Sequence, residues 1–384
     1  MKIMYFLDSA RPQYSGIWYH RVRTPTEALK RRGHAVRWVA IGGKLRPEDV
    51  EWPDVVIFGR TYPNEFKPLE DMKKFKNAGK RVLYDIDDDH WAVSPDNPSQ
   101  LVSNSQKDQY EGMMKMCDGI CTPSAILGKK IQKLVKKPVY ICPNGIEFGN
   151  EDDVYKERPR KTDNQITIGY MGASSHWKDL SIIVPAMEQI CKKYDNVYFW
   201  IYGMAAEPLE SAAYTARLIK QNNWRPEQKD YIDAMVEFYD QLRFIRLIHT
   251  PFMPPEIHPG ILASRDFDIG ICPLIDCEFN HAKSCIKFYE YAATGTVTLA
   301  SDVEPYKSEV DYRAKNTTKD WYDKLEKLIT DEEFRKKLQE KQTKWVTENR
   351  SVDAIGLDWE LACQLPSKKG APKVLNQIRK LIKK

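Results

Sequence analysis

Two lysines and a glutamate in the segment 280–295 have the spacing of one helical face. Lys283, Lys287 and Glu290 stand at positions i, i+4 and i+7, so a continuous helix would place all three on the same side. Ammonium groups near the start of a helix suit a diphosphate, because the helix dipole favours anions there. A carboxylate one turn later can accept hydrogen bonds from a ribose diol. The spacing therefore indicates a nucleotide site, although a surface helix with a Lys–Glu pair has the same pattern.

The flanks of this segment indicate an α/β sheet. The apolar run 267–274 before it predicts a buried strand, and the run 296–300 after it predicts the next one. A helix between two parallel strands begins at the carboxyl end of the first strand, where open α/β sheets bind ligands. A second strand-to-helix loop at 172–178 has backbone amides that can also face phosphates.

An acidic run follows another predicted strand in the first half of the chain. Residues 85–90 contain four aspartates and His90, which suggests a metal site or a general base. Three adjacent carboxylates cannot all face one ion from the end of a strand. We therefore expect Asp88 and His90 to cap the strand or to line a substrate site, with a role as base left open. Arg60, just beyond the run 55–58, is a candidate for holding an anionic substrate group.

The composition is that of a globular protein without a membrane span. Of 384 residues, 42% are hydrophobic and 29% are charged, and no apolar run approaches the roughly 20 residues that a bilayer requires. The eight cysteines are scattered without a CxxC pair, which favours free thiols in a cytoplasmic compartment. The net charge is +5. Its basic clusters suit solvated helix faces, a polyanion or an anionic membrane; they lie at 30–32, 73–76, 129–137 and 368–384.

Short β-rich runs alternate with amphipathic helical stretches along most of the chain. Near-continuous apolar strands separated by helices indicate parallel sheets covered on both faces. The predicted strands form two series, 3–7, 35–41, 55–58, 81–86, 119–122 and 139–142, then 166–170, 197–202, 244–248, 269–272 and 297–300. Two such series predict an α/β protein with two doubly wound, Rossmann-like domains.

Turn chemistry marks the boundary between the two domains. The sequence Pro-Asn-Gly at 143–145 ends the first series, and a polar stretch follows before the pattern restarts at Ile166. Residues 204–242 are longer than a crossover needs, so we predict a helical insertion that shapes an acceptor or partner site or caps the sheet. The predicted units are an N-terminal domain 1–146, a linker 147–164, a C-terminal domain 165–345 and a helical segment with a basic tail, 346–384.

These motifs resemble the GT-B nucleotide-sugar glycosyltransferases of family 4. The block 283–295 is similar to the nucleotide-sugar signature of that family, and residues 141–146 are similar to its interdomain crossing. Residues 168–180 resemble the start of its donor domain, and residues 16–34 resemble its opening loop and helix. Residues 84–91 resemble an acidic loop found in a subset of these enzymes, several of them encoded by phages. The resemblance covers about residues 1–310.

The resemblance implies a GT-B architecture, with two Rossmann-like domains facing a cleft and C-terminal helices packing back. The implied reaction transfers a sugar from a UDP- or GDP-linked donor, with retention at the anomeric carbon and without a metal or cofactor. Lys283 and Lys287 would stabilise the departing diphosphate. His176 would contact donor phosphate or sugar, or else cap a helix. The implied donor-binding residues are Gly16, Gly172, Lys178, Ser284 and Glu290; the implied acceptor side holds Arg60, Asp88 and His90.

One position departs from the family pattern. Many members carry two glutamates with seven residues between them, and the second matches Glu290, but Ala282 stands where the first would be. Glu278 or His281 are the nearest substitutes. The identity of the sugar is therefore left open.

The acceptor is also left open. The resemblance favours a glycan or lipid-linked glycan made at the inner membrane face, which the basic tail 374–384 would contact as an amphipathic helix. The same charges and the acidic loop fit a modified base in DNA, and Ala282 allows a nucleotide-binding protein without catalysis. A dehydrogenase is disfavoured because no GxGxxG follows the first strand, and a glycoside hydrolase because no carboxylate pair stands out.

Overall fold

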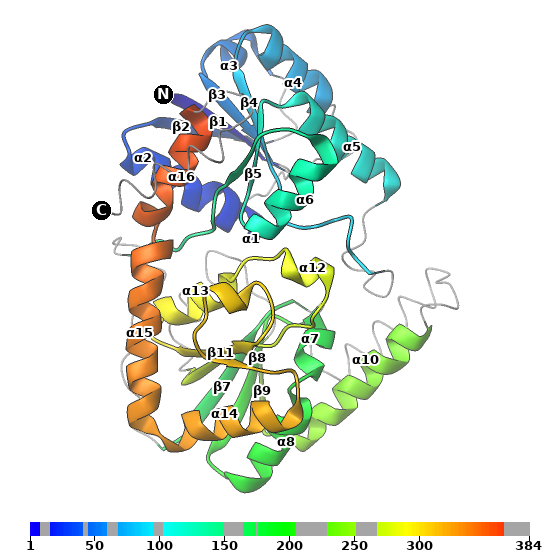
Figure 1. The fold of residues 1–384 in the computed structure, drawn as a ribbon, viewed down its shortest axis with the longest axis vertical. Coiled ribbons are helices and arrows are strands. Elements are labelled where there is room, and N and C mark those ends of the chain that lie inside the picture. Colours follow the sequence, from blue (N-terminus) through cyan, green and yellow to red (C-terminus); the bar gives the residue numbers. More distant parts are fainter. Residues whose placement is uncertain are drawn as a thin grey trace.

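The chain folds around two parallel sheets of six strands each, one above the other in Figure 1. The structure, a computed structural model, describes residues 1–7, 16–40, 45–59, 68–94, 103–148, 164–173, 176–204, 229–250 and 267–364. The two sheets confirm the predicted pair of doubly wound halves.

The first sheet is formed by the N-terminal half. Its strands are β1 (Lys2–Leu7), β2 (Ala35–Ala40), β3 (Val55–Phe58), β4 (Arg81–Asp85), β5 (Gly119–Thr122) and β6 (Val139–Ile141). The strand order is β2-β1-β3-β4-β5-β6. Strands β3 and β5 are buried along their whole length, as apolar strands covered by helices on both faces should be.

The second sheet has the strand order of a dinucleotide-binding fold. Its strands are β7 (Ile166–Met171), β8 (Val197–Tyr202), β9 (Leu247–Thr250), β10 (Ile269–Cys272), β11 (Val297–Ser301) and β12 (Arg313–Ala314). The order β12-β11-β10-β7-β8-β9 reverses direction between β7 and β10. At such a switch point the loops after the two strands diverge and leave a crevice for a ligand.

Helices cover both sheets. In the first half they are α1 (Gly16–Trp18), η2 (Tyr19–Arg23), α2 (Thr24–Arg31), α3 (Pro47–Glu51), α4 (Pro68–Asn77), α5 (Asn104–Met116) and α6 (Ala125–Val135). In the second half they are α7 (Trp177–Ser181), α8 (Val184–Lys193), α10 (Lys229–Gln241), η6 (Leu242–Phe244), α12 (Glu278–His281), α13 (Ile286–Ala293), η7 (Tyr306–Ser308) and α14 (Thr318–Thr330). Side-chain caps begin several of them, such as Ser124 at α6, whose hydroxyl accepts from the Leu127 amide.

Two long helices complete the fold. Helix α15 (Glu332–Arg350) runs beside the second half, and α16 (Val352–Gln364) returns to pack against α2 of the first half (Figure 1). Val352, Ile355 and Trp359 of α16 share a buried cluster with Tyr5 and Leu83. The predicted packing of C-terminal helices back onto the molecule is therefore confirmed.

One predicted strand is misplaced. The run 244–248 was expected as a strand, but residues 242–244 form the short helix η6 and the strand β9 begins only at Leu247. Phe244 is 64% exposed, so its apolar side chain does not mark a buried strand position. Of the predicted insertion 204–242, only residue 204 and residues 229–242, which include α10, fall in the described ranges.

The chain crosses twice between the two halves, and the crossings are paired. Ile146 on the first crossing and Ser351 on the second form a parallel β-bridge. The Ile146 amide donates to the Arg350 carbonyl at 2.7 Å, and the Val352 amide donates to the Ile146 carbonyl at 2.9 Å. None of the described helices combines the length and the apolar character that a membrane span requires.

Candidate nucleotide site

The segment 280–295 is not the single helix that the spacing of its charges predicts. Helix α12 ends at His281 and α13 begins only at Ile286, so Lys283 and Ser284 lie in the connecting loop. In a continuous helix the Ala282 carbonyl would accept from the amide four residues later. Here it accepts instead from the Ser124 hydroxyl of the first half, at 2.6 Å. A contact between the halves therefore replaces a helical hydrogen bond.

The two lysines nevertheless both lie near the start of α13. Lys287 stands in the first turn of this helix, where backbone N–H groups have no intrahelical acceptor. Neither Lys283 nor Lys287 forms an ion pair with a carboxylate in the described part of the chain. Burial, together with the charge of Lys283, lowers the pKa of Lys287. Two half-buried ammonium groups that repel each other and have no salt-bridge partner among the described residues form a site for an anion.

A histidine and an aspartate at the start of α7, the helix after β7, face these lysines. The Nδ1 of His176 lies 2.8 Å from the Asp179 Oδ2. Burial, reinforced by the charges of Lys287 and Lys283, lowers the pKa of His176 to about 4. The imidazole is therefore neutral at pH 7. Its Nδ1–H donates to the carboxylate, which makes Nε2 a hydrogen-bond acceptor.

Asp179 is the residue that fixes this arrangement. Its side chain is buried, and its Oδ1 accepts from the Ile275 amide at 2.9 Å and from the Asn280 side chain at 3.2 Å. Although burial opposes ionisation, the hydrogen bond with His176 lowers the pKa of Asp179. Asp179 thus ties α7, which follows β7, to the loop and helix that follow β10 at the switch point.

The floor of the site is made by β7. The Lys287 Nζ lies 5.8 Å from the centre of the Tyr170 ring, and the Tyr170 hydroxyl is buried without a hydrogen-bond partner among the described residues. A Cβ on Gly172 would lie 2.7 Å from that hydroxyl. Gly172 is therefore required where the chain leaves β7 above the tyrosine. Lys178, on α7, is half-buried, with its Nζ 5.6 Å from the centre of the Trp177 ring.

Glu290 faces the first half and not Lys287. Only 4% of Glu290 is exposed, and its Oε1 lies 3.3 Å from the His20 Nε2. The Lys287–Glu290 surface pair allowed by the spacing is therefore absent from the ion pairs of the described residues. Gly16 begins the helix α1 just before His20.

The acidic run of the first half is mostly committed to internal contacts. Asp85 pairs with Arg21, and Asp89 pairs with Lys130 at 2.6 Å. Asp88 is half-buried in the loop after β4, and His90 is buried beside the Tyr110 ring, 5.3 Å between centres. No described contact brings Asp88 or His90 to the lysine pair. Arg60 lies outside the described residues.

The two residues considered as substitutes for a glutamate at 282 are also committed elsewhere. Glu278 accepts from Lys130 of α6 at 2.7 Å, and His281 pairs with Asp276. Ala282 itself is 1% exposed and packs against the apolar cluster of the first half. Position 282 therefore makes a contact between the halves.

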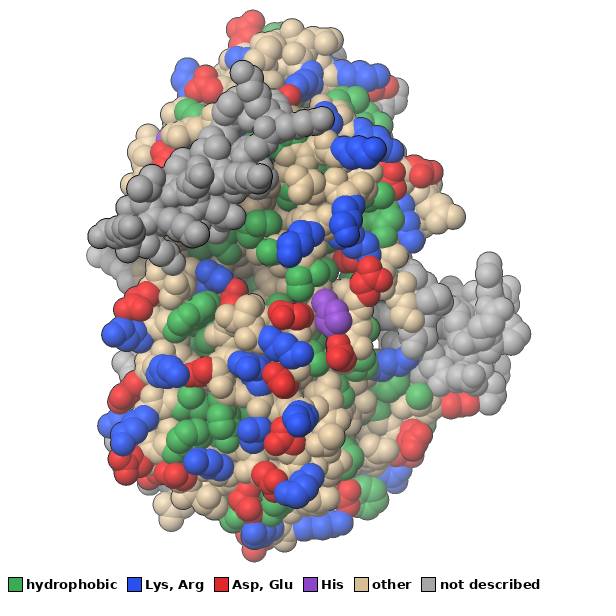
Figure 2. Space-filling model, in the orientation of Figure 1, with side chains coloured by type: hydrophobic (Ala, Val, Ile, Leu, Met, Phe, Trp, Pro, Cys, Tyr) green, Lys and Arg blue, Asp and Glu red, His purple; other side chains and the backbone are tan. Residues whose placement is uncertain are grey.

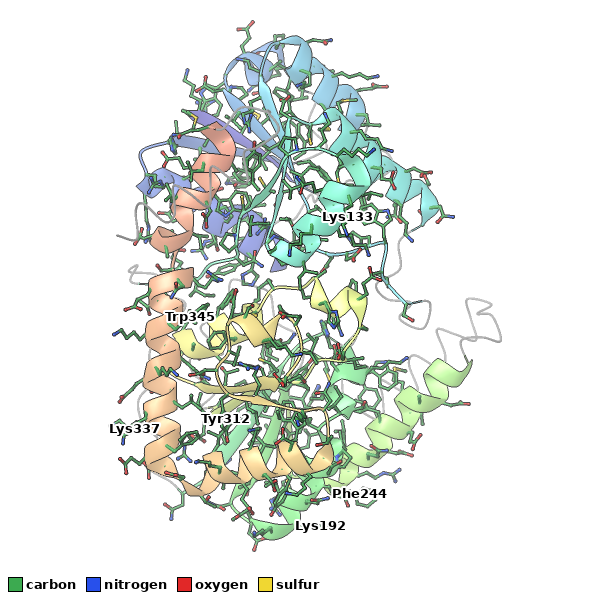
Figure 3. All side chains as sticks on the ribbon, in the orientation of Figure 1. Lys133, Lys192, Phe244, Tyr312, Lys337 and Trp345 are labelled. Atoms are coloured by element: carbon green, nitrogen blue, oxygen red, sulfur yellow. The ribbon has the colours of Figure 1, made fainter. Side chains whose placement is uncertain are left out.

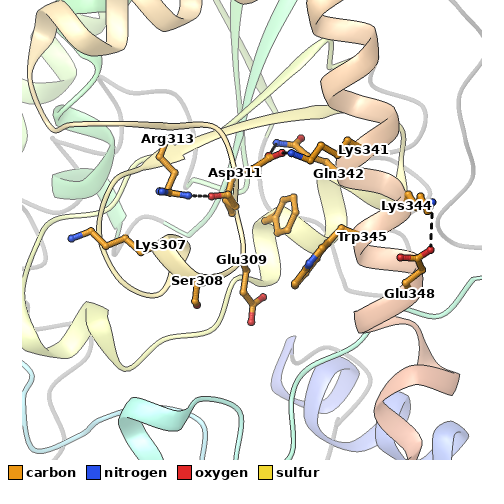
Figure 4. A pocket seen from close by; sticks show the side chains of 12 residues that line it. Lys307, Ser308, Glu309, Asp311, Arg313, Lys341, Gln342, Lys344, Trp345 and Glu348 are labelled. Carbon is orange, nitrogen blue, oxygen red and sulfur yellow. Dashed lines mark hydrogen bonds and ion pairs between the residues drawn. The ribbon is translucent and has the colours of Figure 1, made fainter. Parts of the chain in front are cut away.

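A separate pocket of about 460 Å³ lies on the outer side of the second half, between residues 307–313 and α15 (Figure 4). Its cations are largely neutralised. Lys341 pairs with Asp311 at 2.7 Å, and Lys344 lies 3.9 Å from Glu348. Neither Lys283 nor Lys287 lines this pocket, so it is distinct from the candidate nucleotide site.

Sequence reasoning missed three groups at the site. Asp179 follows His176 by three residues at a helix start, a spacing that could have suggested the pair. His20 and Asn144 gave no such signal, because their partners Glu290 and Ser284 are more than a hundred residues away.

The fold is shared with solved structures, although no protein-family model and no curated protein matches the sequence. HepE of Anabaena, solved with UDP and glucose, has a TM-score of 0.61 and 12% identity over 95% of this chain and 100% of its own. A glycosyltransferase from Rickettsia africae has a TM-score of 0.59 and 13% identity, covering 94% and 98%.

TarM of S. aureus, solved as a mutant with UDP among its ligands, has a TM-score of 0.55 and 14% identity. That match covers 81% of this chain but 55% of TarM, so the chain spans only about half of TarM. At these identities the likeness establishes the fold: two Rossmann-like halves in the GT-B arrangement.

Proposed function

We propose that the protein is a glycosyltransferase that uses a nucleoside-diphosphate sugar. The observation that carries this proposal is the pair of lysines without counter-ions, Lys283 and Lys287, at the switch point of a Rossmann-ordered sheet. The UDP complexes of HepE and TarM, which share the fold, support a UDP-linked donor.

The proposed roles follow from charge and hydrogen-bonding capacity. In the transfer, the acceptor oxygen bonds to the anomeric carbon while the bond from that carbon to the β-phosphate oxygen breaks. Lys283, Lys287 and the first amides of α13 stabilise the charge that develops on the leaving diphosphate. The acceptor hydroxyl loses its proton to the leaving phosphate, which corresponds to retention without a covalent enzyme intermediate.

His176 and Glu290 are proposed to hold the two ends of the donor. Because His176 is neutral and its Nε2 is an acceptor, it suits a sugar hydroxyl, whereas an ionised phosphate has no proton to offer it. Glu290 suits the ribose diol. Ser284, Gly172, Lys178 and Gly16 are proposed to complete donor binding. No metal is assigned to this reaction.

The acceptor is proposed to be a glycan or lipid-linked glycan at a membrane surface. The support is the outer face of α6, which carries Lys129 and Lys133 beside the partly exposed Ile126 and Leu134. Residues 123–138 contain five lysines and no acid. Lys133 points outward in Figure 3, and Figure 2 shows basic side chains with apolar neighbours over this region. Apolar groups among unpaired lysines suit anionic lipid better than DNA; the tail 374–384 lies outside the described residues.

Calorimetric titration with UDP tests the donor site. The wild-type protein should bind UDP, and Lys283→Ala and Lys287→Ala should each weaken binding on the order of tenfold to a hundredfold, because each removes a charge-assisted contact. Lys341→Ala, in the separate outer pocket, is the matched control and should bind as wild type. Equal affinity in all four proteins would refute the site, and hydrolysis or transfer of UDP-sugar would separate an enzyme from a binding protein.

A further inference from the structure

A π-helical turn in the first half lies against the donor side of the second. The turn η2 (Tyr19–Arg23) connects α1 and α2, and the Thr24 amide closes it on the Tyr19 carbonyl, five residues back. Such wide turns are rare and occur often at functional sites. Four of its five residues are buried. Two consecutive residues of the turn are connected to the proposed donor site: His20 contacts Glu290 directly, and Arg21 is linked to Ser284 through Asn144.

Arg21 is the centre of a buried network. Its guanidinium is 2% exposed; Nε donates to Asp85 Oδ2 at 3.0 Å, and Nη1 donates to the Cys142 carbonyl at 2.7 Å. The same Nη1 donates to Asn144 Oδ1 at 2.8 Å, and the group stacks 4.7 Å from the centre of the Trp359 ring. The two-pronged pairing with Asp85 fixes the plane of the guanidinium.

This network determines which way the Asn144 amide faces. A guanidinium can only donate hydrogen bonds, so the Asn144 oxygen must face Arg21 and its NH₂ group must face the opposite way. The Asn144 Nδ2 therefore donates to the Ser284 Oγ, at 2.8 Å. With its oxygen occupied as an acceptor, the Ser284 hydroxyl can direct its own proton to another group.

We propose that Arg21 and Asn144 are positioning residues that set the Ser284 hydroxyl as a hydrogen-bond donor to the diphosphate of the bound nucleotide. This inference rests on the proposed function. Diphosphate oxygens only accept, and Ser284 stands between Lys283 and the first turn of α13. A hydroxyl with its proton directed at the anion adds a third donor to the two ammonium groups. Each group in the series donates a hydrogen bond to the next, from Arg21 to Asn144, from Asn144 to Ser284 and from Ser284 to the ligand.

The same turn holds a second donor-side residue. His20 Nε2 contacts Glu290 Oε1, so adjacent residues of η2 reach both the diphosphate and the ribose parts of the proposed site. Donor binding therefore depends on the contact between the two halves.

The isosteric substitution Asn144→Asp tests this relay, by which we mean the hydrogen bonds from Arg21 to Asn144 and from Asn144 to Ser284. The new carboxylate still accepts from Arg21 but cannot donate to Ser284, so the serine would turn its proton toward that carboxylate and present lone pairs to the anion. We expect UDP affinity measured by calorimetry to fall by on the order of tenfold or more. Ser284→Ala should weaken binding similarly, and Ser284→Thr should restore it. In the double variant Asn144→Asp/Ser284→Ala, the two losses should be clearly less than additive.

Lys130→Gln is the control, because it breaks another link between the halves without touching this network. It should leave UDP affinity within about twofold of wild type, because Lys130 contacts neither Asn144 nor Ser284. If the losses of UDP affinity in Asn144→Asp and Ser284→Ala were fully additive, or if Asn144→Asp bound UDP as wild type does, the relay would be overturned. The proposed function would still stand, provided that the wild-type protein binds UDP.

Hydrogen exchange of the ligand-free protein distinguishes failure of the relay from failure of the proposed function. The relay predicts faster amide exchange in residues 284–288 of Asn144→Ala, which removes the contact with Ser284, than of wild type, whether or not UDP binds. Unchanged exchange there overturns the relay on its own. Absence of UDP binding by wild type refutes the proposed function instead.

Discussion

At the scale of single residues, the site is defined by which lysines lack a salt-bridge partner. Most described lysines near carboxylates form ion pairs, as Lys130 does with Asp89 and Glu278. Lys283 and Lys287 do not, and their charges also act on His176, where burial has the larger effect on its pKa. An anion that binds here relieves the repulsion between the lysines. The same repulsion destabilises the ligand-free protein, so the site gains affinity for an anion at a cost in stability.

The low pKa of His176 predicts a pH-dependent stability. The folded protein holds the imidazole neutral down to a pH of about 4, whereas the unfolded chain takes up the proton near 6.5. Between these values the unfolded chain binds more protons, so the free energy of unfolding should fall as the pH falls, by up to about 3 kcal/mol. His176→Asn should lack this component, which urea unfolding from pH 7 to about 4.5 measures. Parallel curves for the two proteins would contradict the assignment.

At the scale of elements, the position of α13 depends on one glycine of the sheet beneath it. The Tyr291 ring of α13 lies over Gly270 of β10, where a Cβ would come within 2.5 Å of the ring. The Tyr291 hydroxyl accepts from the Met171 amide of β7, at 2.9 Å. The helix that carries Lys287 and Glu290 is thus docked on both strands of the switch point.

Gly270→Ala should displace this helix. We expect a loss of about 1–3 kcal/mol in the free energy of unfolding, because the added methyl overpacks a buried contact, together with weaker UDP binding. Gly112→Ala in α5 is the control. Its Cβ would meet the Leu69 side chain only at 3.4 Å, and alanine favours a helix by roughly 0.5–1 kcal/mol. Chemical denaturation with and without UDP measures both, and wild-type values for Gly270→Ala would refute the docking argument.

At the scale of the whole molecule, the site joins two separately built halves. Ser124 at the start of α6 contacts the Ala282 carbonyl, and Lys130 on the same helix bridges to Glu278. The basic, partly apolar face of α6 therefore borders the line along which the halves meet (Figure 1). A membrane bound at this face would lie beside the proposed transfer site.

Vesicle sedimentation tests this arrangement. The protein should bind vesicles that contain anionic lipid and not neutral ones, with a salt-sensitive affinity. Lys129→Glu/Lys133→Glu should weaken binding by roughly thirtyfold or more, because each lysine near an anionic surface contributes about 1 kcal/mol and each glutamate adds repulsion. Lys319→Glu/Lys337→Glu on α14 and α15 is the matched control.

Removal of residues 365–384 in parallel measures the contribution of the basic tail. Unchanged binding in the α6 variant would refute the role of α6. If the protein bound duplex DNA and not the anionic vesicles, a nucleic-acid acceptor would be favoured.

The amino-acid sequence alone determined the architecture and the residue types of the site. Alternating apolar strands and amphipathic helices predicted both sheets, because burial on two faces imposes its pattern locally. It also predicted Lys283, Lys287 and their place after a buried strand. It predicted one helix at 280–295, which was wrong because local pattern does not record which groups a neighbouring half will contact. It also placed the strand β9 three residues too early, because the apolar Phe244 is exposed.

Only the tertiary structure decided how these residues are oriented. The Ala282 carbonyl accepts a hydrogen bond from Ser124, the Glu290 carboxylate contacts His20, and the Ser284 hydroxyl accepts from Asn144. Each partner lies more than a hundred residues away. The free energy of such a contact depends on distance and burial, which the fold creates and which the spacing of residues along the chain does not contain.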